Sequence, residues 1–146
     1  MDVTAADVDR IPLSNLRVDR GAFVAVWAAA ERRLDDEAEP DWHTAGVADV
    51  CRWLAQATVR PASGPWFAAP APATSRPERA LPERIDAEWR TAEALACRSA
   101  TCAEHAERPG WLDGVCAAFR WAWCGEGGPP LSVMADSCTV ITPDRG

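Results

Sequence analysis

Three cysteines and one histidine are spaced closely enough to suggest a metal site. Their pattern is Cys-x4-Cys-x2-His-x10-Cys, formed by Cys97, Cys102, His105 and Cys116. Three thiolates and one imidazole are a common ligand set for tetrahedral zinc. Two features oppose this hypothesis. The Cys-x2-Cys spacing of many zinc sites is missing, and Cys116 falls on an apolar helix face, where cysteine often packs as a small hydrophobic residue. A zinc-stabilised module is therefore one hypothesis for this chain.

A thiol-dependent enzyme is a second hypothesis that the same cysteines raise. A cysteine becomes nucleophilic when a neighbouring imidazole holds its sulfur as a thiolate. The chain has six cysteines but only two histidines, His43 and His105, and spacing does not show which of them meet. The sequence contains no Gly-x-Ser-x-Gly elbow, phosphate-binding loop or dinucleotide fingerprint. We predict no catalytic residue from these patterns.

Eight tryptophans in 146 residues favour a third hypothesis, the binding of another protein. Several of these side chains lie off the apolar stripes of the predicted helices. They could meet one another in a second internal core, or they could form an aromatic surface for a partner, because tryptophan is a typical interface anchor. We predict a non-catalytic adaptor or regulatory subunit whose partner-binding residues are Trp53, Trp66, Phe67 and Trp121.

Composition and charge exclude other function classes. All 15 basic residues are arginine, they form no block, and the net charge is −7, so we predict no nucleic-acid binding. The longest apolar run, residues 21–30, is far shorter than the roughly 20 residues of a membrane helix. The N-terminus has acidic residues in place of the basic region of a signal peptide. We therefore predict a cytoplasmic protein with reduced cysteines and no membrane partner.

The elements that must position these residues are mainly helical. Apolar residues at three- and four-residue spacing predict helices over about 20–36, 44–58, 82–97 and 111–124, and the first dozen residues could add a short turn. Asp19 is a suitable N-cap for the first, and Pro82 suits the first turn of the third. The sequence predicts a compact bundle of four to five helices.

The last predicted helix is apolar on two sides. One face carries Trp111, Val115 and Phe119, whereas Gly114 and Trp121 lie on the opposite face. A helix of this kind is usually buried at the centre of a bundle. Either another part of the chain or a partner protein must cover its second face.

Residues 59–77 form a Pro/Trp-rich strap of a different composition. Its prolines exclude regular helix and favour an extended path. We expect the strap to lie against the domain with Trp66 and Phe67 docked. The predicted organisation is an N-terminal lead-in over 1–19, one helical domain over 20–128 and an irregular C-terminal tail over 129–146, in which 138–141 could form a strand.

Three segments, Cys51–Ala55, Gly64–Trp66 and Pro109–Trp123, together resemble small helical proteins of high-GC actinobacteria. The resemblance spans about Arg20 to Pro130. It implies a bacterial cytosolic protein. No activity is established for proteins of that kind, so the resemblance assigns no catalytic residue.

Overall fold

The computed structural model describes residues 1–39, 41–61, 63–98 and 107–133. Within these ranges the chain is mainly α-helical, as predicted, with a small sheet of two strands. The helices are α1 (Ala5–Asp9), α2 (Arg20–Asp36), α3 (Trp42–Leu54), α4 (Pro82–Cys97) and α6 (Trp111–Ala122). A 3-10 turn, η1 (Leu13–Asn15), follows α1, and the strands are β1 (Thr58–Val59) and β2 (Phe67–Ala68).

Local chemistry determines where the helices begin. The Asp19 carboxylate accepts a hydrogen bond from the Ala22 amide at 3.2 Å, and Pro82 is the first residue of α4. Both helices therefore have the predicted bounds. Asp41 caps α3 in the same way, because its carboxylate accepts a hydrogen bond from the His43 amide at 3.1 Å. This cap starts α3 at Trp42, two residues before the predicted start.

Helix α3 is also shorter than predicted at its C-terminal end. It ends at Leu54 because Gln56 adopts a left-handed backbone conformation with φ of 54°. The predicted last turn instead forms β1, in which Thr58 pairs with Ala68 and Val59 pairs with Phe67. The strap therefore begins as a short antiparallel hairpin.

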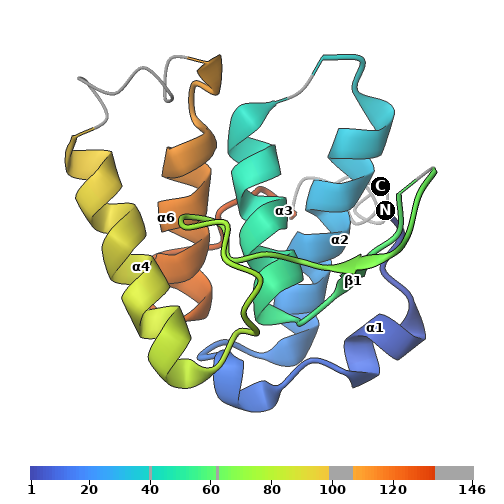
Figure 1. The fold of residues 1–146 in the computed structure, drawn as a ribbon, viewed down its shortest axis with the longest axis horizontal. Helices are drawn as coiled ribbons and strands as arrows, with labels where there is room; N and C mark the ends of the chain where they lie inside the picture. The colour runs from blue at the N-terminus through green and yellow to red at the C-terminus, as the bar shows by residue number, and fades with distance from the viewer. Residues whose placement is uncertain (40, 62, 99–106, 134–146) are drawn as a thin grey trace, which may run out of the picture.

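Four helices lie side by side in the order α4, α6, α3 and α2 (Figure 1). Two glycines bring α3 and α6 close together. A Cβ atom at Gly46 would lie 2.2 Å from the Trp111 carbonyl oxygen, and one at Gly114 would lie 2.2 Å from the His43 carbonyl oxygen. The small residues on the second face of α6 thus serve helix packing inside the domain.

The first nineteen residues are more than a lead-in. Ile11 and Leu16 are buried in the main core. The Asn15 side-chain amide is buried and donates hydrogen bonds to the carbonyl oxygens of Leu54 and Ala80, both at 2.9 Å. This segment therefore joins the end of α3 to the residues that lead from the strap into α4.

The strap crosses one face of the helical layer (Figure 1). A buried carboxylate, Glu88 of α4, accepts hydrogen bonds from the amides of Ala73 at 2.6 Å and Thr74 at 2.7 Å. The Trp53 indole N–H donates to the Glu78 carbonyl oxygen at 2.8 Å. Side chains of two helices therefore hold the extended segment in place.

None of the helices in the described ranges combines the length and the apolar composition that a membrane crossing requires.

Candidate functional site

Two of the four aromatic residues predicted to bind a partner belong to the core. Trp53 is 1% exposed and meets Phe119 edge to face, with ring centroids 6.2 Å apart. Trp121 is 5% exposed and stacks on Phe23 of α2 at 6.5 Å. Both side chains are covered by other parts of this chain, so the structure does not offer them to a partner.

The other two aromatic residues lie at the surface. Trp66 is 65% exposed and its neighbour Phe67 is 49% exposed, so the expectation that the strap docks them against the domain is wrong. The strap contacts the domain through small residues instead, because Ala69 and Ala71 are buried. We call Trp66 and Phe67 the aromatic pair. Trp66 is the last residue before β2, and Phe67 is the first residue of β2.

The Trp66 ring of the aromatic pair contacts an arginine that is itself held by an ion pair. The Arg60 guanidinium lies 5.5 Å from the centroid of the Trp66 ring, within the range of a cation–π contact. The same guanidinium donates hydrogen bonds to both carboxylate oxygens of Asp7, at 2.9 and 3.1 Å. An exposed tryptophan is therefore supported by an ion pair to α1.

Asp7 is itself built into the start of α1. Its buried side chain accepts hydrogen bonds from the Thr4 amide at 2.9 Å and from Arg10 at 2.7 Å. Burial alone would raise the pKa of Asp7, but the hydrogen bonds from Thr4 and Arg60 outweigh it and lower the pKa. The carboxylate that anchors the hairpin thus stays charged at neutral pH.

Two of the four predicted zinc ligands, Cys97 and Cys116, lie among the described residues. Cys102 and His105 lie outside the described residues. Cys97 is exposed at the end of α4, whereas Cys116 is buried within α6. Among the residues described, no group of three histidine, cysteine or acidic side chains could hold a metal ion.

Two of the described cysteines, Cys51 and Cys116, have raised pKa values and are therefore poorly suited to form thiolates. Burial and the charge of the neighbouring Glu93 raise the pKa of Cys116 to about 12. Burial and the charge of Glu31 raise the pKa of Cys51 far above its ordinary range. Neither environment favours metal ligation or nucleophilic attack, both of which require the deprotonated sulfur.

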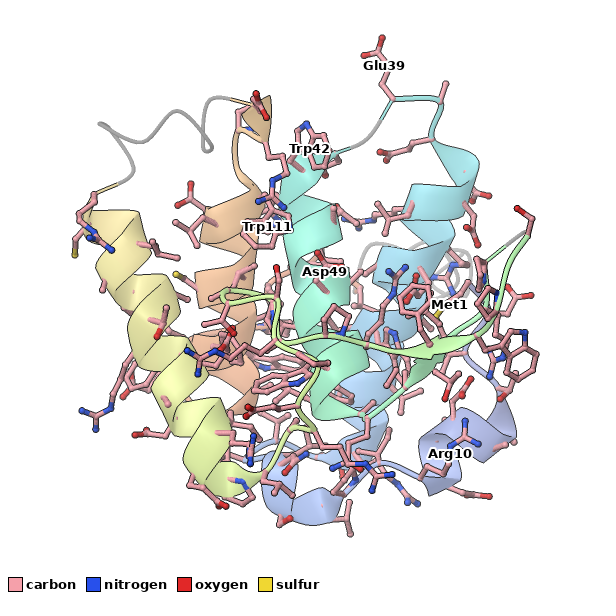
Figure 2. The ribbon with its side chains drawn as sticks, viewed as in Figure 1. Met1, Arg10, Glu39, Trp42, Asp49 and Trp111 are labelled. Carbon is pink, nitrogen blue, oxygen red and sulfur yellow. The ribbon has the colours of Figure 1, made fainter. Side chains whose placement is uncertain are left out.

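A pocket lies beside the aromatic pair. It has a volume of about 250 Å³, and Phe67, Pro70 and Pro72 of the strap line one side. Asp49 of α3 and Trp111 of α6 line the other, where the indole N–H donates to the Asp49 carboxylate at 2.9 Å (Figure 2). We call this space the strap pocket.

Charged groups surround the inner wall of the strap pocket. Arg52 donates hydrogen bonds to the buried Glu31 carboxylate at 2.6 and 2.7 Å, and its other terminal nitrogen lies 3.8 Å from Asp49. The Arg108 guanidinium lies over the Trp111 ring, 4.0 Å from its centroid. Desolvation raises the pKa of Asp49, although the Trp111 hydrogen bond and Arg52 act in the opposite direction.

The polar residues of the strap pocket were missed by sequence reasoning. Asp49, Arg52 and Arg108 form no motif, because they come from two separate segments of the chain. Glu31 offered a signal: it is four residues after the buried Trp27, whose indole N–H donates to it at 2.9 Å. An acidic residue on an apolar helix face indicates a buried partner of opposite charge.

Comparison with family models, with curated proteins and with solved structures finds no match for this chain.

Proposed function

We propose that this chain is a non-catalytic protein-interaction module of the cytosol and that the aromatic pair, Trp66 and Phe67, anchors its partner. The observation that carries the proposal is the exposure of two adjacent large aromatic side chains, at 65% and 49%. Isolated exposed apolar residues are ordinary, but tryptophan dominates the binding energy of many protein interfaces.

The support beneath the aromatic pair favours binding over accidental exposure. Arg60 contacts the Trp66 ring while its guanidinium is hydrogen-bonded to the buried Asp7. A side chain held in one place before binding loses less conformational freedom when a partner covers it. The hairpin thus offers a preorganised anchor.

Co-purification with a double variant tests this proposal. Tagged protein expressed in its own cells is expected to retain a stoichiometric second protein under gentle conditions. The variant Trp66→Ala/Phe67→Ala is expected to lose it, because removing an interface anchor typically costs about 2 kcal/mol or more, roughly a thirtyfold weaker Kd.

The matched control is Leu13→Ala, which removes another exposed apolar side chain, 63% exposed, from a different part of the surface. It is expected to keep the partner. Both variants should retain the far-ultraviolet circular dichroism of the parent. Retention of the same partner by the double variant would contradict the proposal.

A further inference from the structure

One cationic side chain of the strap pocket, Arg108, makes no ion pair with a described residue, although its charge acts on Asp49 and opposes the desolvation that raises the pKa of that carboxyl. Among the residues described, no carboxylate lies within ion-pair distance of the half-buried Arg108 guanidinium. Its contact is with the face of Trp111, 4.0 Å from the ring centroid. Stacking on an aromatic ring holds the planar guanidinium in a fixed orientation, which leaves its N–H groups free to bind a ligand.

The other charged groups of the pocket are already engaged. Arg52 is held by two hydrogen bonds to Glu31. The Asp49 carboxylate accepts the Trp111 indole hydrogen bond at 2.9 Å and faces Arg52 at 3.8 Å. Arg108 is therefore the group through which this pocket can recognise a charge, and the charge it recognises is negative.

The opposite side of the pocket is apolar. Phe67, Pro70 and Pro72 line it, and the volume of about 250 Å³ suits a small ligand. Ser75 lies at the same pocket in a left-handed backbone conformation, with φ of 61°, and adds a hydroxyl group. Strained residues of this kind are often found where ligands bind.

We infer that the strap pocket binds a carboxylate carried on a small apolar group. The Arg108 guanidinium receives the carboxylate, and the apolar group packs between Trp111 and the side chains of Phe67 and Pro72. A paired guanidinium and carboxylate form two parallel hydrogen bonds, which give both affinity and orientation. Such a ligand is either a free organic acid or the C-terminal residue of a polypeptide.

Nuclear magnetic resonance with matched probes tests this inference. The probes are 3-phenylpropionate, 3-phenylpropanamide and 3-phenylpropylamine, which share one apolar group and differ in charge. The reporter is the Trp111 indole N–H, which lines the pocket. We expect a saturable shift with phenylpropionate, with a Kd in the millimolar range or tighter, and weaker binding of the other two.

Three variants assign the binding to Arg108. Arg108→Gln is expected to weaken phenylpropionate binding by about tenfold or more, because it removes a charge-assisted hydrogen bond. Asp49→Asn keeps an acceptor for Trp111 but removes a negative charge, so it is expected to tighten binding severalfold. Arg90→Gln, whose side chain is 73% exposed on α4, is the control and should change nothing.

The inference would be overturned if Arg108→Gln has the same α6 amide shifts as the parent, which shows that it is folded, and binds phenylpropionate equally well. The inference would also be overturned if the protein prefers 3-phenylpropylamine and Asp49→Asn removes this preference, because Asp49 would then be the group that recognises the ligand. If Arg108→Gln does not fold, Arg108→Lys keeps the charge without the planar fork and should still weaken binding.

Two peptides distinguish the sources of the ligand. An acetylated Gly-Gly-Phe with a free carboxylate binds if the pocket receives a polypeptide C-terminus, and the same peptide as an amide does not. Binding of phenylpropionate but neither peptide supports a free organic acid. Failure of both the free acid and the carboxylate peptide to bind overturns the inference, and leaves the test of the aromatic pair unaffected.

Discussion

At the scale of single residues, the charged groups that the fold buries are its most sensitive points. Glu31 is 1% exposed, and its carboxylate receives hydrogen bonds from Trp27 and Arg52. A buried charge is tolerated only when partners replace the water that it loses. The pairing also fixes Arg52 at the inner wall of the strap pocket.

Replacement of Glu31 should therefore be costly. Glu31→Gln keeps the shape of the side chain but removes the carboxylate that is hydrogen-bonded to the Arg52 guanidinium, which leaves only the more distant Asp49 opposite it. We expect a loss of about 3 kcal/mol of unfolding free energy, measured by urea denaturation. The control, Asp36→Asn, changes an exposed carboxylate of the same helix and should stay within about 0.5 kcal/mol of the parent. Equal effects of the two substitutions would show that the buried ion pair contributes nothing.

Asp7 gives a prediction about acid stability. Its pKa is lowered in the folded protein, so the charged carboxylate stabilises the fold above the ordinary titration range of aspartate and this contribution is lost as pH falls through the folded pKa. Asp7→Asn should reduce stability at pH 7 and flatten its decline below about pH 4. Unfolding free energies measured between pH 7 and pH 3 test this, and parallel curves for the two proteins would refute it.

At the scale of elements, the crossing of α3 and α6 depends on Gly46 and Gly114. Each glycine faces a backbone carbonyl that a Cβ atom would approach to 2.2 Å, and a backbone cannot move aside as a side chain can. Gly46→Ala and Gly114→Ala should each cost about 3 kcal/mol in thermal or urea unfolding.

The matched control is Gly128→Ala, where nothing lies within 4 Å of the added atom. Its stability should match that of the parent within about 0.5 kcal/mol. Comparable stability of all three variants would mean that α3 and α6 do not approach as closely as described.

The strap depends on Glu88 in a similar way. Glu88→Ala removes the acceptor of the Ala73 and Thr74 amide hydrogen bonds. We expect those two amides to exchange with solvent deuterium faster by at least about tenfold, while the amides of α2 keep their protection. Glu83→Ala, at an exposed position of α4, is the control. Unchanged exchange at Thr74 in Glu88→Ala would show that other contacts hold the strap.

The helices were predictable because local signals decide them. The Asp19 cap and Pro82 fix the starts of α2 and α4 without reference to the rest of the chain. The end of α3 was not predictable, because a glutamine, Gln56, takes the left-handed conformation that usually marks glycine. That conformation is stabilised by tertiary contacts, among them the hydrogen bond from the Gln56 side chain to the Ala80 carbonyl.

The placement of the tryptophans was harder to predict for a related reason. Trp53 and Trp121 lie off the main apolar stripe of their helices, and this position left open whether they form a second internal core or a surface for a partner. Helices α3 and α6 each have a neighbour on two sides, so each buries two faces. Trp66 and Phe67, in contrast, lie in a strap whose small residues make the contacts, which the prolines alone did not indicate.

At the scale of the whole molecule, the strap brings the two candidate sites together. Phe67 belongs to the exposed aromatic pair and also lines the strap pocket. The hairpin is tied to α1 through Arg60 and Asp7, and the extended segment after it is tied to α4 through Glu88. The hairpin and the extended segment are thus both tied to helices beside the two candidate sites.

Photo-crosslinking at the aromatic pair tests this interpretation most directly. Phe67 is replaced by a photoreactive phenylalanine analogue in cells that express the protein, and the same analogue is placed at Leu13 for comparison. Both positions are exposed, at 49% and 63%. A protein that crosslinks in stoichiometric yield at position 67 and not at position 13 is the predicted result. Identical crosslinking patterns at both positions, or none at position 67, would contradict the assignment of the aromatic pair as the partner-binding surface.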